Sequence, residues 1–349
     1  MTSDALQHVQ AGNGVTHLSL GKETVCGLAW ATVVKSPLSC PACVAAVKDL
    51  DRELKEQEAR IAWTTGDLGY KLDPVQLDIA AKIDAAWAPR KLPAGATEEE
   101  RLKAIPPAWY YLLLARGFGK SVLCCVRALM KGRRQKDARI YYAAPEKKDA
   151  LDIVRDTVEL KLLADCPKEL RPVWSPSESL YNFPGTGAVW RIKGVNSESA
   201  DTLRGPGAHL FVLDEMGGMD HAEYVVRSVV DPMITRDGWH GNLLVATTPA
   251  KEAGHGSQEI FRECVNAGVA SKHTLLENNS LSWEDKARAM RSCGEKDADI
   301  PAILAGKMLP RTTTARREYF CMFVVDGASA VHPDWPDLEP ELTVRVERG

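Results

Sequence analysis

The chain has 349 residues, of which 45% are hydrophobic and 26% are charged, and its formal net charge is −3. This length and composition are typical of a globular protein with one large domain and a small additional segment. No apolar run approaches the roughly 18 residues of a membrane span. Residues 1–14 lack the basic and apolar regions of a signal peptide, so a cytoplasmic location is expected. The net charge gives no overall attraction to nucleic acid.

Local basic patches are therefore the candidate contacts with DNA, although a solvated charged surface is the favoured interpretation of each. They comprise Lys131, Arg133, Arg134, Lys136 and Arg139 in one case and Arg311, Arg316 and Arg317 in the other.

Potential metal ligands gather near the start of the chain. Cys40 and Cys43 flank a tight turn that can direct two thiolates at one ion, and His17 and Cys26 lie on short β-like segments upstream. Three cysteines and one histidine match a closed tetrahedral Zn²⁺ site of the structural type. In so small a segment the metal would supply stability that the core cannot. The alternative is that Cys43 is a buried thiol and His17 a surface residue. The arrangement resembles small zinc ribbons of actinobacterial and phage proteins.

A helix is predicted to begin at Pro74, with Asp73 as its N-cap. Gln76 lies in its first turn, where an amide could pair with the edge of an adenine base. From these residues alone an exposed helical glutamine is the favoured interpretation. Residues 44–60 have a helical period typical of a connector, and residues 88–108 have the composition of a surface loop.

A phosphate-binding loop is predicted after the apolar run 109–114. The run ends in a turn that contains Gly117 and Gly119, and a second apolar stretch of helical length follows at 122–130. In a strand, glycine turn and helix of this kind, backbone N–H groups and the helix dipole favour an anion.

The turn closes with Lys120 and Ser121. Lys120 would reach the β- and γ-phosphates, and Ser121 would place its hydroxyl on Mg²⁺. The spacing departs from G-x-x-x-x-G-K-[ST], because Leu114 stands where the first glycine would be. The flanking apolar segments nevertheless favour a nucleotide site over an accidental turn.

Further strands and one helix are predicted downstream. Residues 138–144 form a buried strand that Pro145 stops, and a helix follows over 148–163. Two short strands, 179–183 and 188–195, are joined by a Pro-Gly-Thr-Gly turn and predict a hairpin.

The run 209–215 contains a second chemical motif, an apolar strand that ends in Asp214 and Glu215. Ligands bind at the carboxyl ends of strands in open α/β sheets. Asp214 would hold Mg²⁺ through its water shell, and Glu215 would orient and deprotonate an attacking water.

A further strand, 242–246, leads into Thr247 and Thr248, whose hydroxyls would face the γ-phosphate. Beyond it, residues 258–325 carry helical segments.

The order of these motifs resembles the ATPase part of the phage terminase large subunit, the motor that packages viral DNA. The resemblance runs from about Leu72 to Phe323. Its motifs are the upstream adenine motif Leu72–Gln76, the loop Ala115–Ser121, the segment Leu203–Gly205, the strand Leu210–Glu215, the coupling motif Ala246–Pro249 and the closing stretch Arg317–Phe323.

The resemblance implies an α/β P-loop NTPase of the ASCE type, with a mostly parallel central sheet flanked by helices. It implies that Gln76 contacts adenine and that Arg204 acts as an arginine finger on the ATP of a neighbouring subunit. Arg116, inside the loop, is the rival for that contact. We expect a zinc-ribbon-like segment at 1–50, the ATPase core at 51–270, a helical linker subdomain at 271–325 and a tail at 326–349.

The expected function is hydrolysis of Mg²⁺-bound ATP to move double-stranded viral DNA into a procapsid. The implied partners are the terminase small subunit, the portal protein and further copies in a ring, in the host cytoplasm and not in the mature virion. The family usually continues into an RNase H-like nuclease. That nuclease needs three or four carboxylates spread over a domain of roughly a hundred residues or more. Asp326, Asp334 and Asp337 lie in the 26 residues after Phe323 and are not expected to build it, so the nuclease is expected to be absent, on a separate chain or outside this sequence.

Three other functions are consistent with the same motifs. A helicase would also use a P-loop and duplex DNA, but it would need further nucleic-acid motifs that the sequence does not show. A small-molecule kinase would use Asp214 or Glu215 as a base toward a hydroxyl group. A non-catalytic adaptor would need no water-activating carboxylate, so Glu215 argues against it.

Overall fold

The computed structural model describes the chain in two compact units, Met1–Thr65 with Asp165–Glu169 and Gly66–Ala164 with Leu170–Gly349. Within them the structure describes residues 41–89, 95, 97–99, 105, 107–195, 203, 205, 207–235, 240–252 and 254–324, and the backbone alone of 6–10, 16–20, 23–24 and 32–33.

The first unit contains a small antiparallel sheet in the order β3-β2-β1-β4. Its strands are β1 (Leu6–Gln10), β2 (Thr16–Leu20), β3 (Glu23–Thr24) and β4 (Thr32–Val33), and helix α1 (Pro41–Thr65) follows. Cys43 and Trp63 are buried, and Trp63 Nε1 donates a hydrogen bond to Asp165 Oδ1 at 3.1 Å. The helical connector predicted over residues 44–60 lies within this single helix, which includes residue 50. The boundary between a segment 1–50 and a core that begins at 51 stays a prediction.

Most of the predicted zinc ligands lie outside the described residues. The backbone of His17 belongs to β2, but its side chain and the whole of Cys26 and Cys40 are not described. No group of three or more His, Cys, Asp or Glu that could hold a metal occurs among the residues that are described. The zinc site therefore stays a prediction.

The second unit is built on an eight-stranded sheet in the order β12-β5-β11-β10-β6-β9-β8-β7. The strands from β12 to β9 run parallel, and β8 and β7 are antiparallel. They span β5 (Trp109–Leu114), β6 (Arg139–Ala144), β7 (Val173–Ser175), β8 (Leu180–Asn182), β9 (Val189–Gly194), β10 (Leu210–Asp214), β11 (Asn242–Thr247) and β12 (Ala270–His273). Every residue of β10 is buried, as expected for a central strand with both faces covered.

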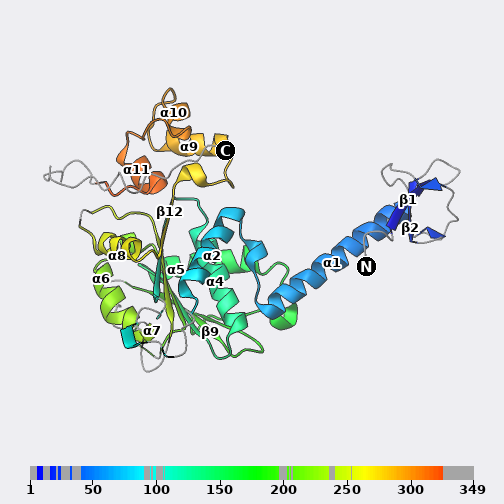
Figure 1. Cartoon of the computed structure of the whole chain (residues 1–349), viewed down its shortest axis with the longest axis horizontal. Helices are drawn as coiled ribbons and strands as arrows, with labels where there is room; N and C mark the ends of the chain where they lie inside the picture. Colours follow the sequence, from blue (N-terminus) through cyan, green and yellow to red (C-terminus); the bar gives the residue numbers. More distant parts are fainter. Residues whose placement is uncertain are drawn as a thin grey trace. The chain divides into compact units, whose positions relative to one another are not determined.

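Helices cover both faces of this sheet, with α2 and α4 on one side and α6 and α8 on the other (Figure 1). The helices are α2 (Pro74–Trp87), α4 (Lys120–Arg134), α5 (Lys147–Arg155), α6 (Ala222–Tyr224), α7 (Asp231–Thr235) and α8 (Gly256–Asn266). Two of them continue into π-helical segments, η3 (Asp156–Leu162) after α5 and η7 (Val225–Val230) after α6. Short 3-10 turns are η2 (Gly69–Lys71), η4 (Lys168–Leu170) and η6 (Met216–Gly218).

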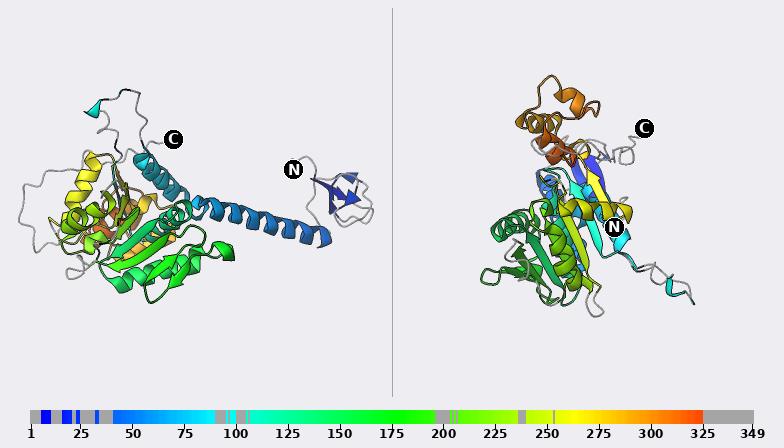
Figure 2. Two further views of the ribbon diagram at one scale, coloured as in Figure 1. Left: turned by 90° about the horizontal axis from the view of Figure 1, so that it is seen from below. Right: turned by 90° about the vertical axis from the view of Figure 1, so that its left-hand side faces the viewer.

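The segment after β12 forms a small helical subdomain at one end of the sheet (Figures 1 and 2). It consists of η8 (Leu275–Glu277), α9 (Trp283–Ser292), α10 (Ile300–Leu304) and α11 (Thr313–Phe320). These elements enclose a core of their own, made of Leu275, Ala287, Met290, Ile300, Ile303, Ala315 and Phe320. The subdomain agrees with the helical segments that the sequence predicts there.

The start of α2 is as predicted. Asp73 Oδ1 accepts a hydrogen bond from Gln76 N at 2.8 Å, and Gln76 Oε1 accepts one from Asp73 N at 3.2 Å. This reciprocal capping box, with Pro74 as the first helical residue, fixes where the helix begins. No described helix combines the length and the apolar character that crossing a bilayer requires.

Candidate functional site

The predicted phosphate-binding loop is present between β5 and α4. Gly117 and Gly119 have φ angles of 77° and 75°, in the left-handed region that favours glycine. Leu114, which replaces the usual first glycine, is the fully buried last residue of β5. Gly119 is the N-cap of α4, so the helix dipole is directed at the loop.

The backbone of the loop is tied to elements on both of its sides. Arg116 N donates to Glu318 O of α11 at 2.7 Å. Asn278 Nδ2, just after η8, donates to Gly117 O at 3.1 Å, and Gln76 Nε2 donates to Phe118 O at 3.2 Å.

Gln76 therefore differs from its expected surroundings. It is buried rather than exposed, and both ends of its amide are used inside the protein. Pairing with an adenine edge through both ends of the amide would require Nε2 to give up Phe118 O or Gly119 O. The adenine contact of Gln76 stays a prediction.

Lys120 folds back onto the loop that it closes. Its Nζ donates to Leu114 O at 3.0 Å and to Ala115 O at 3.3 Å. Burial lowers the pKa of Lys120, and the nearby negative charge of Asp214 opposes that effect. The amino group is thus held inside the loop beside the carboxylate that ends β10.

Asp214 and Ser121 meet as the sequence predicts. Ser121 Oγ donates to Asp214 Oδ2 at 3.1 Å, and Glu215 N donates to Asp214 Oδ1 at 3.0 Å. The buried Asp214 accepts a further hydrogen bond from the hydroxyl of Tyr142 on β6. Burial raises the pKa of Asp214, and the hydrogen bond from Tyr142 and the charge of Lys120 counteract the rise.

Tyr142 is a site residue that sequence reasoning missed. In the parallel register it pairs with Val212, two residues before Asp214, so its hydroxyl can reach the carboxylate at the strand end. The only signal in the sequence is a pair of tyrosines, Tyr141 and Tyr142, in the strand Arg-Ile-Tyr-Tyr-Ala-Ala, and the pattern does not distinguish one from the other.

Glu215 follows Asp214 in an uncommon backbone conformation. Its φ and ψ are 54° and 37°, in the left-handed region that non-glycine residues seldom adopt, and its side chain is partly exposed. Such strain concentrates at functional positions. The pKa of Glu215 is raised, because partial burial and the charge of Asp214 disfavour the ionised form more than Lys120 and Arg116 favour it.

The hydroxyl of Thr247 is used in holding the turn after Glu215. Thr247 Oγ1 accepts a hydrogen bond from Gly217 N at 2.8 Å and donates one to Thr248 O at 2.7 Å. Thr247 is buried and ends β11, beside the carboxyl end of β10. The predicted contact of Thr247 and Thr248 with a γ-phosphate stays a prediction.

Other predicted residues are less close to the site or cannot be placed. Arg204 lies outside the described residues. In the basic patches, Arg133 and Arg317 are buried, and Arg133 Nη1 donates to Pro184 O at 2.7 Å. Arg311 forms an ion pair with Asp299 at 3.2 Å. Several of these cations therefore serve internal contacts, in line with a structural role.

The donor set at the loop is suited to Mg²⁺ carried on a nucleotide. Hydroxyl and carboxylate oxygens are hard ligands, and Mg²⁺ on a nucleotide typically takes only one or two carboxylates from the protein, with phosphates and waters completing its shell. Ser121 offers the hydroxyl oxygen and Asp214 the carboxylate. The N–H groups at the start of α4 offer an anion site for the phosphates.

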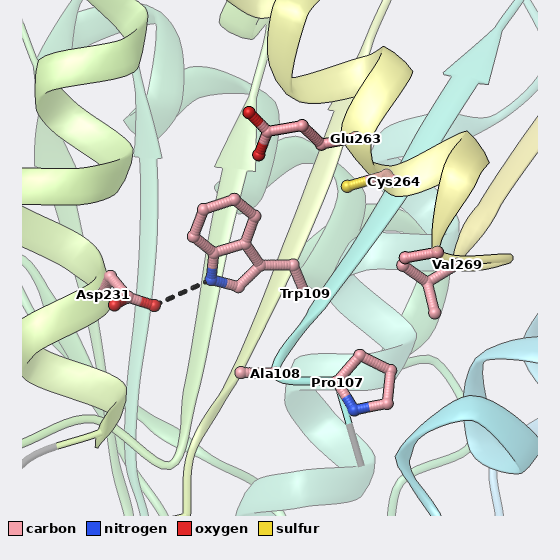
Figure 3. Close-up of a pocket in the computed structure, with 8 residues that line it drawn as sticks. Pro107, Ala108, Trp109, Asp231, Glu263, Cys264 and Val269 are labelled. Carbon is pink, nitrogen blue, oxygen red and sulfur yellow. Dashed lines mark hydrogen bonds between the residues drawn. The ribbon is translucent and has the colours of Figure 1, made fainter. Parts of the chain in front are cut away.

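A separate cavity of about 300 Å³ lies at the opposite end of β5, beside Trp109 (Figure 3). There Trp109 Nε1 donates to Asp231 Oδ1 at 2.9 Å, and Glu263, Cys264 and Val269 complete much of the lining. Because Trp109 begins β5 and the phosphate-binding loop follows its last residue, this cavity is distinct from the candidate nucleotide site.

The fold is similar to solved structures of large terminases. The large terminase of a thermophilic bacteriophage, in complex with ADP, matches with a TM-score of 0.51 and 12% identity over 72% of this chain and 54% of that chain. Another crystal form of the same terminase gives a TM-score of 0.50 and 14% identity over 70% and 53%. The large terminase of bacteriophage HK97 matches with a TM-score of 0.47 and 16% identity, over 72% of this chain and 50% of that chain.

The chain thus spans about half the length of the terminases that it matches. No protein-family model matches the sequence, and no curated protein is similar enough to it to count as a match. At identities this low the structural likeness shows the fold alone. It confirms the predicted α/β fold with a mostly parallel sheet, and it extends the resemblance to phage large terminases from motifs to fold.

Proposed function

We propose that this chain is the ATP-hydrolysing subunit of a motor that translocates double-stranded viral DNA into a procapsid. The observation that carries the proposal is the meeting of Ser121, Asp214 and Glu215 at one end of the sheet, next to the glycine loop that ends in Lys120. The similar fold of a terminase solved in complex with ADP supports nucleotide binding by this chain.

Each residue of the site has a role in this proposal. Ser121 and Asp214 would hold Mg²⁺, which supplies positive charge to the phosphates. Lys120 would stabilise negative charge that develops on the γ-phosphate, once its amino group exchanges the loop carbonyls for phosphate oxygens. Glu215 would orient the attacking water and accept its proton.

A second subunit would complete the site. We propose Arg204 as an arginine finger in trans, with Arg116, exposed inside the loop, as the alternative in cis. Mixing Arg204→Ala protein with Glu215→Gln protein should restore hydrolysis at hybrid interfaces, which hold one intact copy of each group. Failure of every mixture to exceed the separate variants would place the arginine in cis.

The proposal also covers the partners and the first unit. A terminase small subunit, a portal protein and a ring of copies follow from the proposed function, as does action in the host cytoplasm. A separate nuclease chain is one further partner that the proposal allows. For the first unit we propose a structural Zn²⁺ held by His17, Cys26, Cys40 and Cys43, a closed ligand set of the usual type. Metal analysis of purified protein tests it, and less than about half an equivalent of zinc would refute it.

The test of the motor function is ATP hydrolysis as a function of protein concentration, with and without duplex DNA. A motor completed in trans predicts activity that rises faster than linearly with concentration and that duplex DNA stimulates. Hydrolysis that is linear and indifferent to DNA would contradict it. Phosphate transfer to a small hydroxyl acceptor would indicate a kinase instead.

A further inference from the structure

Three successive carbonyl groups of the phosphate-binding loop are hydrogen-bonded by the side-chain amides of two distant residues. Gln76 belongs to α2, ahead of the loop, and Asn278 follows η8 in the helical subdomain. The carbonyls are those of Gly117, Phe118 and Gly119. Neither amide is placed by sequence proximity, so both contacts are features of the fold.

The orientation of the Gln76 amide is fixed on both sides. Its Oε1 accepts from Asp73 N in the capping box, and its Nε2 donates to Phe118 O at 3.2 Å and to Gly119 O at 3.3 Å. A reversed amide would place an oxygen against two carbonyl oxygens and an NH₂ group against an N–H. Gln76 is only 5% exposed, so water cannot replace these partners.

The orientation of the Asn278 amide is also fixed by its partners, and this residue is 2% exposed. Its Oδ1 accepts hydrogen bonds from Ser280 N at 3.0 Å and from Ser280 Oγ at 2.6 Å, which turns Nδ2 toward Gly117 O. The amide therefore links the helical subdomain directly to the loop.

The close approach of Gln76 also explains the residue at position 119. A Cβ added to Gly119 would lie 2.3 Å from Gln76 Nε2. The φ angle of Gly119 is also in the left-handed region that favours glycine. Any side chain here would push the amide off the loop.

We propose that Gln76 and Asn278 are positioning residues that hold the phosphate-binding loop by its carbonyl groups. Each peptide unit has its N–H roughly opposite its carbonyl, so fixing the carbonyls orients the N–H groups available to an anion. Gln76 then contributes to phosphate affinity and not to recognition of the base. This inference rests on the proposed nucleotide site but departs from the adenine contact expected of Gln76.

The test measures equilibrium binding of ATP, GTP and tripolyphosphate by calorimetry in the presence of Mg²⁺. Gln76→Met keeps the side-chain length and removes the amide. Asn278→Asp keeps the acceptor for Ser280 and places an oxygen opposite Gly117 O. Each variant should raise the Kd of all three probes by a similar factor of about tenfold, which corresponds to about 1.4 kcal/mol. The ratio of ATP to GTP affinity should stay at the wild-type value.

Gln57→Met is the matched control, because Gln57 lies exposed on α1, in the first unit. It should leave every Kd unchanged, and melting curves without nucleotide establish that each variant is folded. A Gln76→Met protein that loses affinity for ATP but not for GTP or tripolyphosphate would identify a base contact and overturn the inference.

Two further outcomes keep the proposals separable. If both variants fail to fold, Gln76→Glu decides, because it keeps the acceptor for Asp73 N and loses only the donor to the loop carbonyls. An unchanged Kd of Gln76→Glu for all three probes would contradict the inference. Wild-type protein that binds none of the three probes would instead refute the proposed function itself.

Discussion

Asp214 is a buried carboxylate whose hydrogen-bonding capacity is used almost entirely by the protein. Ser121, Tyr142 and the backbone N–H of Glu215 all donate to it. These donors stabilise the ionised form against the cost of burial, which raises the pKa. They also fix the direction in which Asp214 faces Ser121, so the carboxylate is in place before any metal arrives.

Tyr142→Phe removes one of these donors without changing the packing volume. Because the hydrogen bond is made to a charged group, the free energy of unfolding should fall by about 1.5–3 kcal/mol. The Mg²⁺ concentration that gives half-maximal hydrolysis should rise several-fold, since Asp214 is less firmly oriented. Denaturant unfolding and Mg²⁺ titration measure the two effects.

Tyr141→Phe is the control on the same strand, where Tyr141 stacks on Phe211. It should leave the Mg²⁺ requirement at the wild-type value. An unchanged requirement in Tyr142→Phe would show that the hydroxyl of Tyr142 has no part in positioning Asp214.

His209, at the start of the Asp214 strand, predicts a pH dependence of stability. Burial and the charges of Lys131 and Arg139 lower its pKa from 6.5 to about 4, and Nδ1 accepts a hydrogen bond from Arg139 N at 2.9 Å. The unfolded chain therefore binds a proton that the folded chain does not, so stability falls as the pH drops from 6.5 toward 4. The loss should be only about 1 kcal/mol, because the ring is partly exposed and screened by solvent.

His209→Asn separates this effect from general acid sensitivity. The asparagine oxygen can accept the same hydrogen bond from Arg139 N but does not titrate in this range. Urea unfolding at pH 7 and pH 5 should show a smaller loss for the variant than for wild type. Equal losses would assign the acid sensitivity to other groups.

At the scale of elements, the turn after β10 is hydrogen-bonded to the end of the neighbouring strand β11. Glu215 N donates to Ala246 O at 2.8 Å, and Gly217 N donates to Thr247 Oγ1 at 2.8 Å. The left-handed conformation of Glu215 thus persists because β11 holds the turn on its other side.

Adjacent glycines in this turn offer a matched pair of variants. A Cβ on Gly217 would lie 2.6 Å from Thr248 O and 3.0 Å from Ala250 N, and these backbone atoms would have to move. A Cβ on Gly218 would meet Pro145 Cγ at an ordinary 3.6 Å. Gly217→Ala should lower kcat about tenfold or more with little change in ATP affinity, because Glu215 is displaced by a fraction of an ångström. Gly218→Ala should have the kcat of wild type. Steady-state kinetics measures both variants, and equal kcat values for Gly217→Ala and Gly218→Ala would contradict this expectation.

The elements that sequence reasoning recovered share a strong local signal. β5 and β10 are apolar runs with abrupt ends, and α2 begins with a capping box. The missed strands lack such signals. β12 has the sequence Ala-Ser-Lys-His and lies at an edge of the sheet, and β7 has three residues, among which Val173 is 58% exposed. Their strand conformation comes from pairing with a neighbour, which periodicity does not reveal.

At the scale of the whole molecule, sequence spacing predicted which residues gather but not what holds them. Lys120, Ser121, Asp214 and Glu215 were found because they lie at or just after the ends of apolar strands. Tyr142 and Asn278 were missed, and Gln76 differs from its expected exposure, because these depend on the register of β6 against β10 and on the packing of the helical subdomain. Such long-range contacts leave no pattern in a single sequence.

Glu215 is expected to activate water at a nucleotide held by the loop around Lys120, and the proposed function depends on this step. The most direct test measures ATP binding and the rate of hydrolysis at saturating ATP for wild type and for Glu215→Gln. The Kd values of wild type and Glu215→Gln for ATP should agree within about threefold. The hydrolysis rate of Glu215→Gln should be lower by at least about 100-fold, as expected for loss of a general base. A Glu215→Gln protein that hydrolyses ATP at the wild-type rate would show that Glu215 is not that base.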